Sequence, residues 1–150
     1  MPIITTRGEY ALRTLLDLAL QNPSEMHKAG AIARRTKIPA KFLEAILFQL
    51  RSGGFITSKR GVDGGYMLAR PADRIYLGDV VQVIEGASIL GKHCPSKADD
   101  NQCSAACTCG MFGLWSKLSS AVAEILHKTT IQDLKQEYLA NQNLTASYQI

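Results

Sequence analysis

Four cysteines are the residues of this chain best suited to chemistry, and all of them lie in one short segment. They are Cys94, Cys103, Cys107 and Cys109. In a reducing cytoplasm such a cluster indicates metal binding or thiol redox chemistry before structural disulfides. Residues 91–110 around it are rich in Lys, Ser, Asp, Asn and Gly and show neither helical nor strand periodicity. We therefore expect a functional loop, because long irregular loops are uncommon inside compact domains.

The distribution of charge suggests a different role for the first half of the chain. The net charge of the 150 residues is +4. Residues 1–76 hold 12 basic against 6 acidic residues, whereas residues 77–150 hold 5 against 7. This asymmetry favours a polyanion as the partner of the first half, although ordinary solvated surface charge would give the same count.

Length and hydrophobicity bound the class of protein. A chain of 150 residues with 46% hydrophobic residues is typical of one globular domain with a buried core. Its apolar runs are too short to span a bilayer, and its first residues lack the pattern of a signal peptide. We therefore expect a cytoplasmic location.

The first part of the chain has the pattern of a helix-turn-helix. Apolar residues recur at helical spacing over 6–21, and Thr6 and Glu9 are placed as a capping box for that helix. A second, short helix is expected at 29–36, and a third at 39–52, where it ends before two glycines. The inward face of the third helix is expected to contain Phe42, Leu43, Ile46, Leu47 and Leu50. Two short helices of which the second is strongly amphipathic indicate a helix-turn-helix.

A β-hairpin is expected directly after the third helix. Residues 55–59 and 66–70 have the composition of strands, and the turn 60–65 between them contains three glycines. Glycine adopts left-handed turn conformations without steric cost, so this turn suits a tight hairpin. A helix-turn-helix followed by a basic, glycine-rich hairpin is a winged helix. Its third helix enters the major groove, and its hairpin brings Arg60 to the DNA backbone or the minor groove.

Further helices are expected in the second half. They are a short helix at 77–85, a long helix at 111–127 and a last helix at 131–139 that Thr130 and Asp133 cap. The apolar stripe of the long helix contains Phe112, Trp115, Leu118, Val122 and Ile125, and it is widened by Leu114, Ala121 and Leu126. This is more apolar surface than one small domain needs, which favours a dimer interface over packing on its own domain.

The expected fold class is mainly α with a small β-hairpin wing, a winged helix-turn-helix followed by a long dimerisation helix. The expected parts are a DNA-binding domain at 1–76, a connecting helix at 77–90, the cysteine loop at 91–110, dimerisation helices at 111–139 and a flexible tail at 140–150.

Candidate DNA contacts lie at the start of the third helix and in the wing. Ala40, Lys41 and Glu44 share the exposed face of the helix, where a lysine can reach phosphate or guanine and a glutamate can accept from cytosine N4. In the wing, Arg60 and Gly61 are expected at the DNA. The residues expected to hold phosphates are Arg7, Arg34, Arg35, Lys37 and Lys59. An ordinary solvated helix face would carry similar charges.

Four sequence segments resemble one family of bacterial regulators. They are TRGEYALR at 6–13, FLE at 42–44, QLR at 49–51 and, above all, KRGVDGGY at 59–66. They resemble the IscR/NsrR/CymR family, and the resemblance runs over about residues 1–139. Members are dimeric winged-helix transcription factors, of which some bind an iron–sulfur cluster and some do not. The resemblance implies a homodimeric regulator that binds double-stranded DNA and is not an enzyme.

The resemblance also assigns the cysteines to an iron–sulfur cluster. In cluster-binding members three ligands come from the loop, and the last lies six residues before a Trp, as Cys109 does before Trp115. Cys103 keeps the family spacing to Cys109, and Cys94 matches the first ligand, although it lies farther from Cys103 than usual. Cys107 is an extra thiol that could replace one of the three. By analogy a 2Fe–2S cluster is favoured over 4Fe–4S.

The fourth ligand departs from part of the family. Where IscR-like members have a His three residues after the last Cys, this chain has Phe112. Glu9 aligns with a carboxylate that ligates the cluster across the dimer in NsrR-like members, so the partner subunit's Glu9 is the candidate, with His93 as a weaker one. The competing role of Glu9 is the capping box with Thr6. A carboxylate ligand would leave a labile iron position, which suits a sensor.

Other uses of the cysteines stay open. Their spacing fits the paired C-x₂₋₄-C arrangement of structural zinc sites poorly. A cluster-free thiol switch could join Cys107 and Cys109, or another pair, in a disulfide on oxidation. A thiol oxidoreductase would leave the wing unexplained, and no Cys-x-x-Cys lies in a βαβ pattern. The favoured function is a dimeric regulator that senses iron, redox state or nitric oxide.

Overall fold

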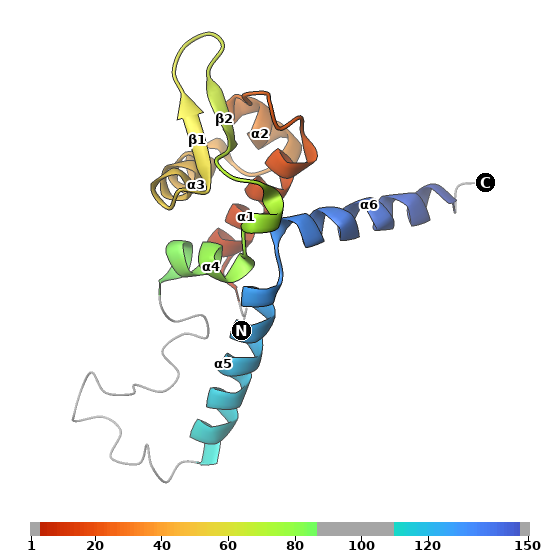
Figure 1. Cartoon of the computed structure of the whole chain (residues 1–150). Helices are drawn as coiled ribbons and strands as arrows, with labels where there is room; N and C mark the ends of the chain where they lie inside the picture. Colours follow the sequence, from red (N-terminus) through yellow and green to blue (C-terminus); the bar gives the residue numbers. More distant parts are fainter. Residues whose placement is uncertain (1–3, 87–109, 148–150) are drawn as a thin grey trace.

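The structure, a computed structural model, describes residues 4–86 and 110–147 of the chain (Figure 1). The elements of these residues are α1 (Thr6–Leu20), α2 (Ala29–Thr36), α3 (Ala40–Ser52), β1 (Ile56–Lys59), β2 (Gly65–Leu68), the 3-10 turn η1 (Ala72–Arg74), α4 (Leu77–Glu85), α5 (Gly110–Lys128) and α6 (Ile131–Ser147). None of the helices in this part of the chain is long and apolar enough to cross a membrane.

One hydrophobic core holds α1 to α4 and the hairpin together. Leu15 of α1, Leu47 of α3 and Val80 of α4 are each at most 1% exposed, and Ile56 brings the base of the wing into the same cluster. Apolar residues three and four positions apart form one face of each helix, so the helices bury these faces against one another. The predicted helix-turn-helix and winged-helix architecture is therefore confirmed.

The hairpin is anchored at its second strand. β1 and β2 pair antiparallel with Lys59 opposite Gly65, and Tyr66 exchanges two backbone hydrogen bonds of 2.9 Å with His27 in the connection between α1 and α2. A Cβ atom on Gly65 would lie 2.6 Å from the carbonyl oxygen of His27. Only glycine fits this approach, so the glycine-rich turn fixes the wing against the helix-turn-helix.

One residue of the third helix does not lie where its spacing predicts. Leu43, Ile46, Leu47 and Leu50 are buried as expected, but the side chain of Phe42 is 61% exposed. The i and i+4 spacing places Phe42 toward the side of Ile46, but Phe42 lies about 100° around the helix from the buried Leu43, at the edge of the buried face. The prediction that Phe42 faces inward is wrong.

The start of α1 also differs from the prediction. The N-cap is Thr5, not Thr6, and its side-chain oxygen accepts a hydrogen bond of 3.3 Å from the backbone N–H of Gly8. The carboxylate of Glu9 forms an ion pair with Arg13 one turn further along the helix. A capping box needs the glutamate to turn back to the cap N–H, so the predicted Thr6–Glu9 box is wrong.

The cap of the last helix is confirmed. The side-chain oxygen of Thr130 accepts from the backbone N–H of Asp133 at 3.2 Å, and Asp133 accepts from the backbone N–H of Thr130 at 2.8 Å. The helix itself continues past Leu139 to Ser147, so the tail expected at 140–150 is helical up to Ser147. No Gly or Pro interrupts this stretch, and a polar composition does not prevent a helix.

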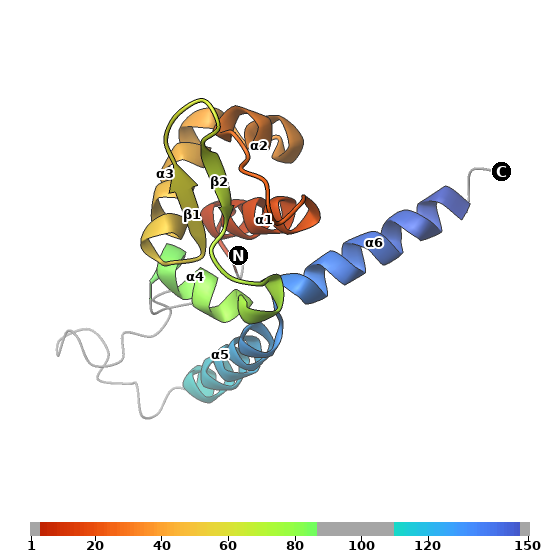
Figure 2. The ribbon, with the colours of Figure 1, turned by 45° about the horizontal axis from the view of Figure 1, so that its top comes forward.

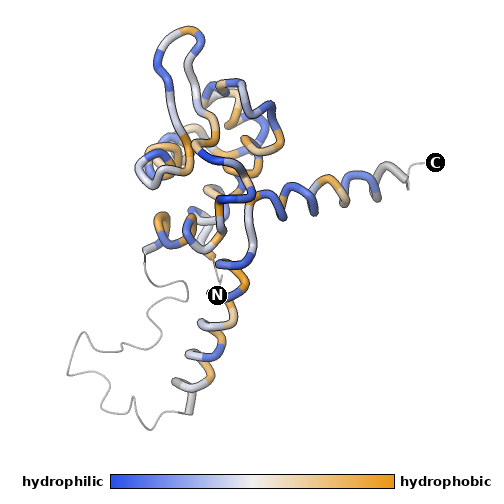
Figure 3. Tube along the Cα trace, viewed as in Figure 1, coloured by the Kyte–Doolittle hydropathy of each residue, from blue (hydrophilic) through white to orange (hydrophobic). Residues whose placement is uncertain are grey.

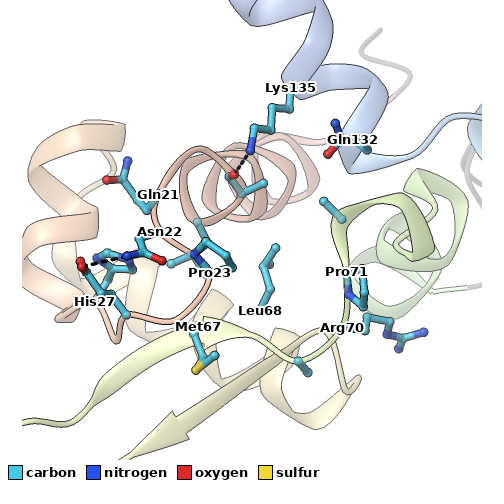
Figure 4. Close-up of a pocket in the computed structure, with 15 residues that line it drawn as sticks. Gln21, Asn22, Pro23, His27, Met67, Leu68, Arg70, Pro71, Gln132 and Lys135 are labelled. Atoms are coloured by element: carbon cyan, nitrogen blue, oxygen red, sulfur yellow. Dashed lines mark hydrogen bonds between the residues drawn. The ribbon is translucent and has the colours of Figure 1, made fainter.

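The two C-terminal helices extend away from the winged-helix core in different directions (Figures 1 and 2). The first turns of α6 lie against the end of α1, where Lys135 Nζ donates a hydrogen bond of 2.7 Å to the carbonyl oxygen of Ala19 (Figure 4). This contact borders a pocket of about 460 Å³ between α1, the end of β2 and α6, with Leu18 and Leu68 among its apolar lining residues. The core thus holds the base of α6, while the rest of that helix projects outward.

Candidate DNA-binding surface and sensor segment

The outer face of α3 is free of the core along its whole length. Ala40, Lys41 and Glu44, the expected base-contacting residues, are all exposed, whereas Leu43 and Leu50 on the opposite side are at most 1% exposed. In Figure 2, α3 lies at the edge of the winged-helix core with the wing strands alongside it. A helix presented in this way has the shape that fits a major groove.

The wing tip carries the other expected contacts. Lys59 and Arg60 are exposed, and Gly61 has a φ of 108°, a conformation that glycine adopts without strain. A Cβ atom on Gly64 would lie 2.1 Å from the carbonyl oxygen of Lys59, so this position also requires glycine. Lys28 Nζ donates a hydrogen bond of 2.8 Å to the carbonyl oxygen of Gly61. The wing tip is therefore held against the start of α2, a role for Lys28 that no local sequence pattern indicates.

The wing is also joined to α3. Arg51 Nη1, in the last turn of α3, donates a hydrogen bond of 3.2 Å to Ser58 Oγ on β1. Arg51 is not among the DNA contacts expected from the sequence. The bond connects the two elements that a winged helix presents to DNA, so their relative position is fixed by side chains as well as by the core.

The remaining basic candidates are in different environments. Arg34 and Lys37 are exposed, and Lys37 ends α2 in the left-handed conformation with a φ of 57°. Arg35 instead forms two hydrogen bonds, of 2.8 and 2.7 Å, with the carboxylate of Asp17 on α1. These bonds raise the pKa of Arg35 above its ordinary value and hold α2 against α1. Arg7 lies in the first turn of α1, at the end of that helix next to α4.

The cysteine segment begins after α4 and ends at α5. Its candidate ligands lie outside the described residues: Cys94, Cys103, Cys107, Cys109 and His93. Within residues 4–86 and 110–147, no group of three or more His, Cys, Asp or Glu could hold a metal ion. Glu9, the remaining candidate, has a side chain that is 59% exposed and paired with Arg13. Its carboxylate is at the surface and held in place by a charged neighbour.

The long helix α5 is only partly covered by its own domain. Leu126 is 7% exposed and packs with Val122 against the core, whereas Leu114, Leu118 and Ile125 are 48, 42 and 64% exposed. Figure 3 shows hydrophobic positions recurring along α5, including the part that extends away from the core. The side chains of the predicted stripe members Phe112 and Trp115 lie outside the described part. The described stripe residues thus divide into one buried and one exposed set.

Known proteins are similar to this chain in both sequence and fold. Residues 4–137 match the Rrf2 family, described as iron-dependent transcriptional regulators. The protein Rrf2 of Nitratidesulfovibrio vulgaris is 33% identical over 136 residues, which cover 89% of this chain and 87% of that protein. The solved structure of CymR, the global cysteine regulator of B. subtilis, is 30% identical with a TM-score of 0.72 and covers 91% of this chain and 98% of its own. The solved structure of IscR from T. potens is 26% identical with a TM-score of 0.70, and the match covers 90% of this chain and 87% of that IscR chain.

These relatives confirm the predicted resemblance to regulators of the IscR and CymR type. The winged-helix core, the exposed α3 and the glycine-dependent wing are consistent with them. The chain belongs to the Rrf2 family of transcriptional regulators.

Proposed function

We propose that two copies of this chain bind one double-stranded DNA site through α3 and the wing, and that the cysteine segment holds an iron–sulfur cluster whose state sets the affinity for DNA. The observation that carries the DNA-binding half is the Arg51–Ser58 hydrogen bond of 3.2 Å, because it joins an exposed recognition helix to an exposed basic wing.

The DNA contacts divide by chemistry. Lys41 and Glu44 on α3 face the base edges, where a lysine donates to guanine and a glutamate accepts from cytosine. Arg60 at the wing tip enters the minor groove or contacts the backbone beside it. Lys59 and Lys37 bind phosphates and so contribute affinity without sequence preference. Arg35 is left out of this surface, because its guanidinium is already bound to Asp17.

The dimer is proposed to form through the exposed side of α5. Leu114, Leu118 and Ile125 are large apolar residues that remain in solvent in the single chain. Burying them against the same helix of a second copy would remove this apolar area from water. Two winged helices held in this way would match two half-sites about one helical turn of DNA apart.

The donor set of the cysteine segment fits an iron–sulfur cluster. Thiolates are the ligands that iron–sulfur clusters favour, and Cys94, Cys103 and Cys109 are proposed to supply three of them. The partner subunit's Glu9 is proposed as the fourth ligand, and a 2Fe–2S cluster is favoured. A bound cluster would supply sensitivity to iron supply, oxidants or nitric oxide. A cluster-free thiol switch is the second candidate, because the related CymR of Staphylococcus aureus has a solved structure of an oxidized form.

The DNA-binding proposal is tested on duplexes selected from random DNA with the full chain. Arg60→Ala is expected to weaken binding by about 1–3 kcal/mol at fixed salt if its guanidinium occupies a narrow minor groove. Lys59→Ala is expected to lower the slope of log K against log salt by about 1, with sequence preference unchanged. Lys117→Ala on α5 is the matched control and should bind as wild type. Unchanged affinity of Arg60→Ala would remove the wing tip from the interface.

The cluster proposal is tested by the visible spectrum of protein purified without oxygen. Cys94→Ser, Cys103→Ser and Cys109→Ser are each expected to abolish the chromophore, and Cys107→Ser to leave it largely intact. The iron and sulfide contents are expected to fall in the three variants that lose the chromophore and to stay near the wild-type values in Cys107→Ser. A colourless wild-type protein with reactive thiols would support the thiol switch instead, and bound zinc without colour would support a zinc site.

A further inference from the structure

A stripe of exposed residues that is uncharged beyond Lys41 lies along the centre of the outer face of α3. Lys41, Ala45, Phe48 and Ser52 are spaced at i, i+4, i+7 and i+11, so they share one line along the helix. All four residues are exposed, and the side chain of Phe48 is 61% exposed. The stripe lies opposite the buried face of the helix. A large aromatic ring therefore occupies the middle of the surface proposed to enter the major groove.

The ring of Phe48 is held in place by its neighbours. The guanidinium carbon of Arg51 lies 5.7 Å from the centroid of the ring, a distance suited to a cation–π contact. Arg51 is in turn fixed by its hydrogen bond of 3.2 Å to Ser58 on β1. An exposed side chain that is pre-positioned in this way loses less conformational freedom on binding than a free one.

The chemistry of the stripe selects its ligand. Phe48 and Ala45 can neither donate to guanine nor bind a phosphate, so they cannot read a base through hydrogen bonds. Among the groups that the four bases present in the major groove, the 5-methyl group of thymine is the apolar one. We propose that the side chains of Phe48 and Ala45 contact thymine methyl groups, and that Phe48 is therefore a specificity-determining residue. This inference rests on the proposed DNA-binding function and adds the base that α3 prefers.

The test compares thymine with deoxyuridine, which lacks only the methyl group. The full-length chain first selects duplexes from a random pool, and each thymine of the selected site is then replaced singly by deoxyuridine. At one or two positions per half-site, wild type is expected to lose about 3- to 10-fold in affinity, the size of one buried methyl contact. Phe48→Ala is expected to bind the thymine and deoxyuridine duplexes equally at those positions.

Phe42→Ala provides the matched control. Phe42 is 61% exposed like Phe48, but it lies about a third of a turn away around the helix. This variant is expected to keep the wild-type preference for thymine. Phe48→Leu retains an apolar side chain and should keep part of the preference, so the inference can be tested even if Phe48→Ala fails to fold. Melting curves of all three variants check their folding.

Different outcomes distinguish the two proposals. Failure of wild type to bind any selected duplex would overturn the DNA-binding function and the inference together. Sequence-selective binding by wild type that is insensitive to every methyl group would overturn the inference alone. The inference is also overturned if Phe48→Ala retains the wild-type methyl sensitivity, whether or not the variant changes the oligomeric state.

Discussion

Glu85, in the last turn of α4, accepts two hydrogen bonds from Thr5, the residue that caps α1. The backbone N–H and the hydroxyl of Thr5 donate to the same oxygen of Glu85, at 2.8 and 2.9 Å. The carboxylate also lies near the N-terminus of α1, where the helix dipole favours negative charge. This contact holds the end of α4 against the start of α1. It therefore fixes the point from which the chain continues toward the cysteine segment.

Gly8→Ala is expected to lower the free energy of unfolding by about 1–2 kcal/mol. A Cβ atom at this position would lie 2.1 Å from Glu85 Oε1 and 2.6 Å from a methyl carbon of Ile4, so it would displace the carboxylate from Thr5. Gly30→Ala is the control, since the nearest heavy atom to its new Cβ would be 3.9 Å away. Urea unfolding of the metal-free proteins measures both. Equal stability of Gly8→Ala and wild type would show that the Thr5–Glu85 contact contributes little.

The same contact shows what sequence reasoning could not reach. Thr6 and Glu9 have the spacing of a capping box, but the acceptor of the cap N–H is Glu85, 80 positions from Thr5 in the chain. Side-chain partners that come together only in the folded chain leave no local signal, and the Lys28–Gly61 and Arg51–Ser58 bonds are of the same kind. Nothing in the sequence near these residues distinguishes them from ordinary surface positions.

Elements set by local chemistry were predicted well. The bounds of α2 and α4 agree with their expected ranges, because apolar spacing and neighbouring turn residues define them. The hairpin follows from the close approaches that Gly64 and Gly65 allow. Helical spacing correctly placed Leu43 and Leu47 in the core, whereas Phe42, at the edge of the same face, is 61% exposed. Burial depends on neighbours as well as on periodicity.

The cap of α6 makes a pH-dependent contribution to stability. Hydrogen bonds from the backbone N–H and then the hydroxyl of Thr130 lower the pKa of Asp133 below its ordinary value. A lowered pKa means that the folded state favours the carboxylate. Its contribution is therefore fully present above the ordinary pKa and is lost as the pH falls through the lowered value.

Thr130→Val is expected to raise the pKa of Asp133 only part of the way back, because the backbone N–H of residue 130 still donates. Carbon-detected NMR titration of the Asp133 carboxyl measures the change directly. In Asp133→Asn the free energy of unfolding should no longer show the decrease at acid pH that protonation of Asp133 causes in wild type. An Asp133 that titrates at or above its ordinary pKa would contradict the capping contact.

Leu118→Glu is expected to convert the proposed dimer into monomers. The side chain of Leu118 is 42% exposed in the single chain, and a carboxylate buried in an apolar interface would be strongly destabilising. Sedimentation velocity at micromolar concentration measures the change, and loss of binding to the selected DNA should accompany it. Val62→Glu at the wing tip, where Val62 is 91% exposed, is the control and should remain dimeric. A wild-type protein that sediments as a monomer would remove α5 as the dimer interface.

Glu9→Gln is expected to weaken or alter the visible spectrum of the proposed cluster, while the cysteines keep the cluster bound. The carboxylate of Glu9 pairs with Arg13 and not with the helix cap, so the capping role no longer competes with the ligand role. Arg13→Gln is the matched control, because it breaks the same ion pair but leaves the carboxylate available to iron. Loss of the exposed pair alone should change the free energy of unfolding by no more than about 0.5 kcal/mol in either variant. A spectrum that changes only in Glu9→Gln would support ligation by Glu9. If both variants have the wild-type spectrum, the fourth ligand must be sought elsewhere, with His93 as the next candidate.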